Sequence, residues 1–200
     1  MQPTQNISPA AYLRSRVGRV CVALQGATVT ELLSRAQAAL AESQFLEFRL
    51  DSVDHPAAAI APIAEFLSEH KARHGDVAVI APCRRKAYGG GFAGTLVAEL
   101  AILADAAKAG FALLDLEIES AEECSPAQLE TLRQTGAALQ ISFHDFAQTG
   151  DPDAIFERIQ QFSPEFVKIV STARSLTDSM RMLNWLKERS GEAQLVGIAM

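Results

Sequence analysis

The stretch Phe166-Val167-Lys168-Ile169-Val170 is an apolar, strand-like run interrupted by a single lysine. A similar run, Leu139-Gln140-Ile141-Ser142-Phe143-His144-Asp145-Phe146, carries a histidine near its end. An ammonium group is costly to bury in a strand unless it is paired, and burial lowers the pKa of a lysine toward the neutral amine that attacks a carbonyl. An amine and a general base at successive strand ends favour Schiff-base chemistry in a barrel mouth. The alternative is a lysine that snorkels from a strand end beside a histidine satisfied in the core.

Short apolar runs of this kind recur along the chain, and most of them lack polar alternation. This pattern is typical of parallel strands buried on both faces. The predicted strands are Val20–Leu24, Phe45–Asp51, Val77–Cys83, Phe111–Ile118, Ala138–Phe143, Phe166–Val170 and Leu195–Met200. Helical patterns fill the intervals, and their predicted starts are Thr28 or Thr30, Pro56, Thr95, Ser125-Pro126, Asp151-Pro152, and Ser175 or Thr177. Repeated strand–helix units predict a right-handed α/β fold with the helices outside.

A (β/α)₈ TIM barrel and an open doubly wound sheet both fit this pattern. No GxGxxG motif follows the first strand, which argues against a dinucleotide-binding sheet. We expect one barrel domain over residues 18–200, preceded by an N-terminal extension over residues 1–17. A complete barrel takes about 250 residues, and about seven βα units are visible here. The sequence therefore predicts a C-terminally incomplete barrel, either cut from a longer polypeptide or covered by a partner.

Bulk properties restrict the class of protein. The chain has 200 residues, is 48% hydrophobic and carries a formal net charge of −6, with dispersed basic residues. These values predict one sizeable core and no nucleic-acid partner. We expect no membrane span and no signal peptide, and the odd count of cysteines favours a reduced protein of the cytoplasm. The cysteines and histidines show no metal-ligand spacing, so no metal is predicted.

Charged residues gather where the predicted strands end, which is where barrels place their catalytic groups. Glu47, Arg49 and Asp51 alternate along the second strand, so a regular strand would point all of them inward. They could pair with one another and plug the barrel, or offer groups to an anionic, polyhydroxylated ligand. Asp115 and Glu117 likewise share a face. Glu117 could orient the His144 imidazole, or it could pair with an interior arginine.

The loop after the third strand contains Gly89-Gly90-Gly91. Four interpretations of this loop are open: a lid, a phosphate cradle, a plain turn before the next helix, and a close backbone approach near the site. Walker spacing is absent, and we favour the close approach.

Taken together, these motifs resemble the type I 3-dehydroquinate dehydratases. The resemblance covers roughly residues 18–200 and rests on the order and spacing of several short motifs. They are Glu47-Phe48-Arg49-Leu50-Asp51, Arg84 with Gly89-Gly90, Asp115-Leu116-Glu117, Ser142-Phe143-His144-Asp145-Phe146, Val167-Lys168-Ile169 and Gly197-Ile198-Ala199-Met200. The family is a cofactor-free (β/α)₈ barrel that converts 3-dehydroquinate to 3-dehydroshikimate in the shikimate or quinate pathway.

The resemblance implies a role for each matching residue. Lys168 would form an imine with the substrate ketone, and His144 would act as general base, with Glu117 supporting it. Three residues, Glu47, Arg49 and Arg84, would hold the hydroxyl and carboxylate groups of the substrate, and Met200 would pack against its ring. A homodimer, or a fusion to another shikimate-pathway domain, is compatible with the family.

The chain also departs from the family pattern. Ala23 stands where a serine is frequent, and Tyr88 replaces a glutamate that helps to position the histidine, which would leave Glu117 to act alone. The family continues beyond the Met200 motif with loops that close over the substrate carboxylate, so we expect weak or no turnover from this 200-residue chain by itself. Alternative interpretations are a catalytically impaired ligand-binding or regulatory module, and another Schiff-base barrel such as a class I aldolase.

Overall fold

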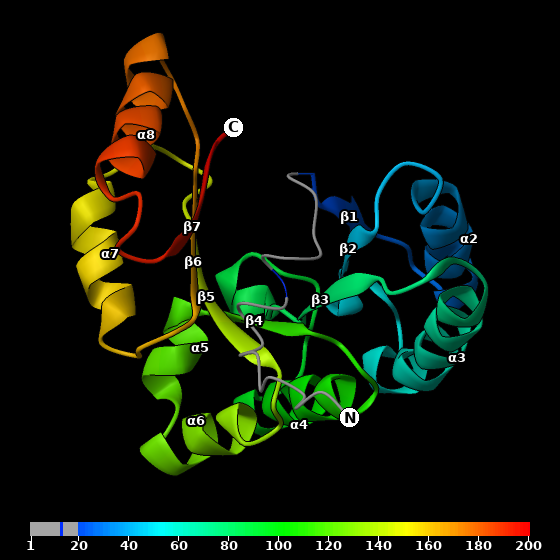
Figure 1. The fold of residues 1–200 in the computed structure, drawn as a ribbon. Coiled ribbons are helices and arrows are strands. Elements are labelled where there is room, and N and C mark those ends of the chain that lie inside the picture. Colours follow the sequence, from blue (N-terminus) through cyan, green and yellow to red (C-terminus); the bar gives the residue numbers. More distant parts are fainter. Residues whose placement is uncertain (1–12, 14–19) are drawn as a thin grey trace, which may run out of the picture.

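The strands of the structure form a single parallel sheet. The computed structural model describes Leu13 and residues 20–200, and within this part the sheet has seven strands in the order β1-β2-β3-β4-β5-β6-β7. Their bounds are β1 Val22–Leu24, β2 Phe45–Phe48, β3 Ala78–Pro82, β4 Leu113–Glu117, β5 Ala138–His144, β6 Phe166–Ser171 and β7 Gln194–Ala199. The sheet curls into an open arc whose end strands are β1 and β7 (Figure 1). The predicted barrel class is confirmed in the form of this curled half-barrel.

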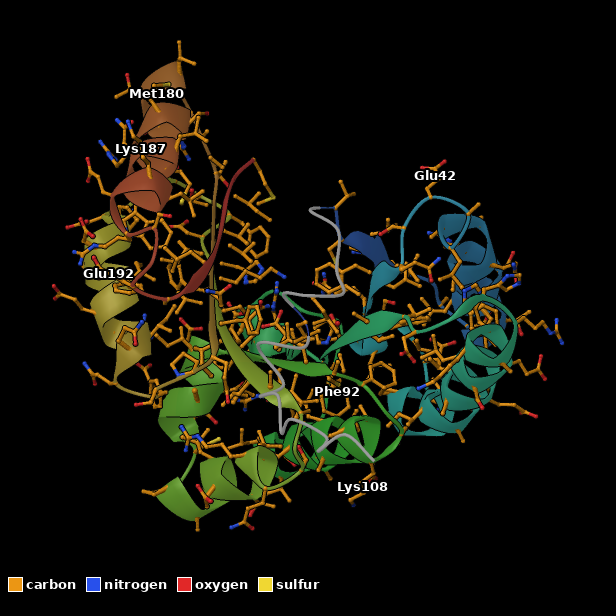
Figure 2. All side chains as sticks on the ribbon, viewed as in Figure 1. Glu42, Phe92, Lys108, Met180, Lys187 and Glu192 are labelled. Atoms are coloured by element: carbon orange, nitrogen blue, oxygen red, sulfur yellow. The ribbon has the colours of Figure 1, made fainter. Side chains whose placement is uncertain are left out.

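Helices cover the convex side of the arc. Figure 1 shows α2 and α3 on the outer side of β1 and β2, α4 to α6 on the outer side of the middle strands, and α7 and α8 on the outer side of β6 and β7. The bounds are α2 Val29–Ala39, α3 Pro56–His74, α4 Leu96–Lys108, α5 Ile118–Glu123, α6 Pro126–Arg133, α7 Pro152–Gln160 and α8 Leu176–Glu188, with 3₁₀ turns η1 Leu50–Ser52 and η2 Lys86–Tyr88. Labelled charged residues at the rim, such as Glu42, Lys108 and Lys187, point away from the sheet (Figure 2).

Several helix starts follow from side-chain caps. Thr28 and Thr95 accept hydrogen bonds from the backbone N–H three residues later, and Ser125 does so within a full capping box with Gln128. Ser175, rather than Thr177, caps α8. Each cap satisfies amide groups that the first helical turn leaves unpaired, so most of the predicted starts are confirmed.

The core lies between the sheet and its helices. Leu46, Leu114, Ile141 and Val167 come from neighbouring strands and are at most 1% exposed. Leu13 is also buried and packs with a second cluster at the amino ends of the strands. The predicted extension over residues 1–17 otherwise lies outside the described residues. No helix in the described part is both long enough and apolar enough to cross a membrane.

Two local predictions need correction. The second strand ends at Phe48 rather than Asp51, because Arg49 leaves the extended conformation (φ −66°, ψ 81°) and η1 begins. The helix α5 follows β4 directly from Ile118, with Glu117 as its N-cap residue. We did not predict this helix, because a six-residue helix gives little periodic signal.

Candidate active site

The inner face of the curled sheet lines a cavity of about 1090 Å³. Most of the predicted site residues are on its wall: Glu47, Arg49, Arg84, His144, Lys168 and Met200. The register explains this convergence, since Glu117 on β4 lies beside Ser142 on β5, which in turn lies beside Lys168 on β6. Parallel neighbours in register point to the same face, so charged groups far apart in the sequence meet inside the arc.

Lys168 is held by carboxylates on both sides. Its Nζ lies 3.0 Å from Oε2 of Glu47 and 3.3 Å from Oδ2 of Asp115. Lys168 and Asp115 are only 8% and 4% exposed. The interpretation of Lys168 as a residue that snorkels to solvent is therefore wrong, since its ammonium group is paired inside the cavity.

The predicted lowering of the lysine pKa is also wrong. Burial by itself lowers the pKa of Lys168, but the charges of Asp115 and Glu47 outweigh it, and the net direction is upward from 10.5. Burial acts to raise the pKa of Asp115, yet the nearby Lys168 and Arg84 prevail and the pKa lies below its ordinary value. The lysine is therefore an ammonium ion between carboxylates.

His144 is fixed through both ring nitrogens. Its Nδ1 lies 3.0 Å from each carboxylate oxygen of Glu117, and its Nε2 lies 2.7 Å from Nη2 of Arg84. A guanidinium can only donate, so Nε2 accepts and the ring proton sits on Nδ1, facing the carboxylate. Glu117 also forms an ion pair with Arg84, whose Nε lies 2.9 Å from Oε2, and accepts a hydrogen bond from Ser142 Oγ at 3.0 Å. Glu117 thus fills both roles that the sequence left open, the partner of the histidine and the partner of an interior arginine.

Tyr88 occupies the position of the glutamate in the family pattern but does not contact His144 as that glutamate was expected to do. Its hydroxyl donates to Glu123 on the outer side of the site. The second anchor of His144 is instead Arg84, so the prediction that Glu117 acts alone is wrong.

The charged residues after β2 separate into different pairs. Arg49 donates from Nε and Nη2 to both carboxylate oxygens of Asp51, at 2.8 and 2.6 Å. Glu47, in contrast, pairs across the cavity with Lys168. The predicted local pairing therefore holds for Arg49 and Asp51, while Glu47 belongs to the lysine.

The glycine triplet is a place of close backbone approach. A Cβ on Gly90 would lie 2.0 Å from the carbonyl oxygen of Arg84, and one on Gly91 would lie 2.1 Å from that of Asp51. The N–H of Gly91 donates to Asp51 Oδ2 at 2.9 Å. The favoured interpretation is confirmed, because these glycines let the loop press against residues of the cavity wall.

Met200 lies at the cavity rim and is 54% exposed. Its backbone is fixed by hydrogen bonds with Ser171 and Ala173. Ala23, which stands in place of a frequent serine, also lines the cavity.

Sequence reasoning missed the partners of several site residues, and Asp115 is an example. Asp115 was recognised as inward-facing, but its pairing with Lys168 was not predicted. The signal was present in its position, since Asp115 lies beside Gln140 and two residues before Glu117 on the same inner face. What the sequence lacked was the reach of the lysine side chain across the arc.

The fold and the site define a class: a (β/α)-barrel protein with a buried lysine and a doubly anchored histidine at the carboxyl ends of its strands. The family model described as type I 3-dehydroquinase matches residues 20–200. The chain belongs to the type I 3-dehydroquinase family.

Individual relatives agree with this assignment. The chain is 32% identical over 172 residues to the 3-dehydroquinate dehydratase of Desulfotalea psychrophila, covering 84% of this chain and 71% of that protein. The fold is similar to the 3-dehydroquinate dehydratase structure from Enterococcus faecalis, with a TM-score of 0.75, 20% identity, and coverage of 98% and 85%. It is also similar to a dehydroquinate dehydratase and shikimate dehydrogenase structure from S. pombe, with a TM-score of 0.69, 16% identity, and coverage of 94% and 37%.

Proposed function

We propose that this chain dehydrates 3-dehydroquinate to 3-dehydroshikimate through an imine on Lys168, with a turnover that is weak but measurable in the 200 residues by themselves. The observation that carries the proposal is the placement of Lys168 Nζ between Glu47 and Asp115 on the wall of the cavity that also contains His144. A lysine amine can act as a nucleophile toward a ketone when the site holds it at a fixed place. Family membership supports the choice of reaction and substrate.

The ammonium group of Lys168 must first lose a proton. Glu47 and Asp115 are the carboxylates within hydrogen-bond distance that could accept it. The neutral amine then adds to the ketone carbon and forms a carbinolamine. The carboxylic acid returns its proton to the carbinolamine hydroxyl, which leaves as water and gives a protonated imine. The positive imine nitrogen attracts electrons and acidifies the adjacent C–H bond.

His144 would then remove the acidified proton with Nε2, because Nδ1 carries a proton and faces Glu117. The resulting enamine expels the neighbouring hydroxyl group, which takes a proton from the imidazolium and leaves as water. Hydrolysis of the conjugated imine releases the product and restores Lys168. Glu117 stabilises the imidazolium formed in between.

When the substrate binds, its polar groups would replace hydrogen-bond partners that the site residues have within the protein. Arg84 donates a hydrogen bond to Nε2 of His144, so the base becomes available when a substrate oxygen draws the guanidinium away. We propose that Glu47, Arg49 and Arg84 bind the hydroxyl and carboxylate groups, and that Met200 packs against the ring. Bidentate Arg–carboxylate contacts suit such a ligand.

Borohydride trapping tests the proposal. The protein is incubated with 3-dehydroquinate and borohydride in the presence of EDTA, and tryptic peptides are mapped by mass spectrometry. We expect a reduced adduct on the peptide that contains Lys168, and none in Lys168→Arg, which keeps the charge but cannot form the imine. A protein that binds 3-dehydroquinate by calorimetry but gives no adduct would contradict the imine and favour a ligand-binding module.

The physiological setting is part of the same proposal. The reaction belongs to the shikimate or quinate pathway, and growth of a dehydroquinase-deficient strain without aromatic amino acids tests the biosynthetic role. The free cysteines Cys21, Cys83 and Cys124 suit the reducing cytoplasm. The S. pombe structure combines a dehydratase with a shikimate dehydrogenase. We propose a similar fusion, or a homodimer, for this protein. Size-exclusion chromatography of the natural polypeptide would distinguish these two arrangements by their mass.

A further inference from the structure

Glu99 is a fully buried carboxylate that lies outside the cavity and has no part in the mechanism above. It lies in the first turn of α4 and is 0% exposed. Its Oε2 lies 3.0 Å from Nε of Arg85 and accepts from Ser120 Oγ at 2.8 Å. Its Oε1 has no hydrogen-bond partner among the described residues. Burying such a group is unfavourable, so the carboxylate calls for an explanation beyond packing.

Arg85 connects Glu99 to the wall of the cavity. It directly follows Arg84, whose side chain reaches inward to His144, whereas the Arg85 side chain reaches outward between α4 and α5. The Arg85 guanidinium also pairs with Glu123 at 2.8 Å and lies over the Tyr88 ring, 4.9 Å from its centroid. Arg85 is therefore held from several directions.

The segment 84–92 is tied together by its own backbone. Phe92 N–H donates to Arg84 at 3.0 Å, Lys86 N–H donates to Phe92 at 2.7 Å, and Gly90 N–H donates to Arg85 at 3.0 Å, each to a carbonyl oxygen. A shift of Arg85 would therefore move the backbone from which the Arg84 side chain extends.

We propose that Glu99 is a positioning residue of this cavity: by holding Arg85, it fixes the backbone that places Arg84 on His144 and Glu117. The Arg85–Glu99 ion pair thus lies behind the Arg84–Glu117 ion pair, and the two arginines are adjacent in the chain. Its kinetic consequence rests on the proposed function, whereas its structural consequence at His144 does not.

The charge state of Glu99 makes the role dependent on pH. Burial raises the pKa of Glu99 to about 7, against the lowering effects of Ser120 and Arg85. Other titratable groups whose charges interact with it are Glu117 from β4, Cys83 after β3 and Cys124 after α5. Burial raises the pKa of both thiols, that of Cys124 to about 11, so they stay neutral between pH 5.5 and 8.5. Over this range Glu99 gains the negative charge that holds Arg85.

The kinetic test compares wild type with Glu99→Gln, which keeps the shape and removes the charge. We expect kcat/KM for 3-dehydroquinate to be similar for both proteins at pH 5.5 and about tenfold lower for the variant at pH 8.5, as for a small misplacement of a reacting group. Dividing kcat/KM of the variant by that of wild type at each pH removes the effect of groups that titrate in both proteins. Arg158→Met is the matched control, because Arg158 pairs with Glu122 of α5 at 2.6 Å without touching segment 84–92. A Glu99→Gln/Arg85→Met double variant should be no worse than Arg85→Met alone.

The spectroscopic test is independent of turnover. In a long-range ¹H–¹⁵N spectrum of histidine-labelled protein, we expect the His144 Nε2 signal to move in Glu99→Gln at pH 8.5 and to stay in place in Arg158→Met. Ser120→Ala removes the hydroxyl that donates to Glu99 and accepts from Arg85, and it should shift the same signal if Glu99→Gln does not fold. Unchanged His144 signals in folded variants would overturn the positioning role. If wild type gives neither a borohydride adduct on Lys168 nor turnover of 3-dehydroquinate, the proposed function is overturned. The His144 signals would still decide the positioning role of Glu99.

Discussion

Arg84 donates a hydrogen bond from Nη2 to Nε2 of His144 over 2.7 Å, on the nitrogen opposite the Glu117 carboxylate. This contact selects the tautomer with the proton on Nδ1. It also occupies the lone pair that a general base needs. Lys168, His144 and Arg84 therefore form a closed network in which each group already has a partner, and binding of a ligand must exchange these partners.

Replacing the base should separate imine formation from proton removal. For His144→Asn we expect turnover to fall by about 10²- to 10⁴-fold, the usual contribution of a general base, while the Lys168 adduct still accumulates with borohydride. Steady-state kinetics and trapping on the same preparation provide the measurement. His55→Asn, on an exposed residue before α3, should behave as wild type. An unchanged turnover in His144→Asn would assign proton removal to another group.

Removing the lysine charge should destabilise the fold over a defined pH range. In Lys168→Met the carboxylates of Glu47 and Asp115 lose their buried partner, and we expect a loss of about 3–5 kcal/mol in unfolding free energy at pH 7. The pKa of Asp115 is lowered from 3.8, so its contribution is present above that value and is lost as the pH falls through the folded-state value. The pKa of Lys168 is raised from 10.5, so its contribution is present below that value and is lost as the pH rises through the folded-state value.

Urea unfolding of wild type and Lys168→Met at several pH values measures this effect. The difference between the two proteins should be largest between about pH 4 and 10 and should shrink outside that window. A difference that stays constant down to pH 2 would show that the ion pairs do not contribute.

Neutralising the carboxylate behind the histidine should affect both rate and stability. In Glu117→Gln the Arg84 guanidinium loses its charged partner and the imidazolium loses its counter-ion, so we expect kcat to fall roughly 10²-fold or more. Removing one partner of a buried ion pair should also lower the unfolding free energy by about 3 kcal/mol. Glu119→Gln on the neighbouring turn, where Glu119 is half-buried and pairs with Arg158, is the control. Equal rates for both variants would remove Glu117 from the mechanism.

The glycine loop should not tolerate a single methyl group. In Gly90→Ala the new Cβ would meet the Arg84 carbonyl oxygen at 2.0 Å, a backbone contact that cannot relax without moving the loop. We expect a loss of about 1–3 kcal/mol in unfolding free energy and weaker binding of 3-dehydroquinate in calorimetry. Gly150→Ala is the matched control, because nothing lies within 4 Å of its Cβ position. Equal stability of the two variants would contradict the close approach.

Glu99 should leave a signature in the pH dependence of stability. Its pKa is raised from 4.5 to about 7, so its contribution is fully present below pH 4.5 and is lost as the pH rises through 7. The size is roughly 3 kcal/mol at 1.36 kcal/mol per unit of pKa shift. The unfolding free energy of Glu99→Gln minus that of wild type should therefore rise between pH 4.5 and 8. Urea unfolding of both proteins measures it, and a flat difference would contradict the raised pKa.

Local signals in the sequence were sufficient for the elements. Apolar runs such as Phe166–Val170 and caps such as Thr95 act over a few residues, so strand positions and most helix starts were predicted from the sequence. The six-residue α5 and the early end of β2 at Arg49 were not predicted, because a short helix and a backbone turn carry weak periodic signals.

The sequence by itself determined the strand–helix order and the presence of charged residues near the carboxyl ends of the strands, since these depend on neighbouring residues and on the periods of strands and helices. The tertiary structure decided which groups became partners. Lys168 meets Glu47 at a sequence separation of 121 residues, and Arg84 meets His144 at a separation of 60. Such pairings depend on the curl of the sheet and the reach of long side chains across it. The same pairings reverse the direction of the lysine pKa, because the opposing charges outweigh the burial that the strand alone would suggest.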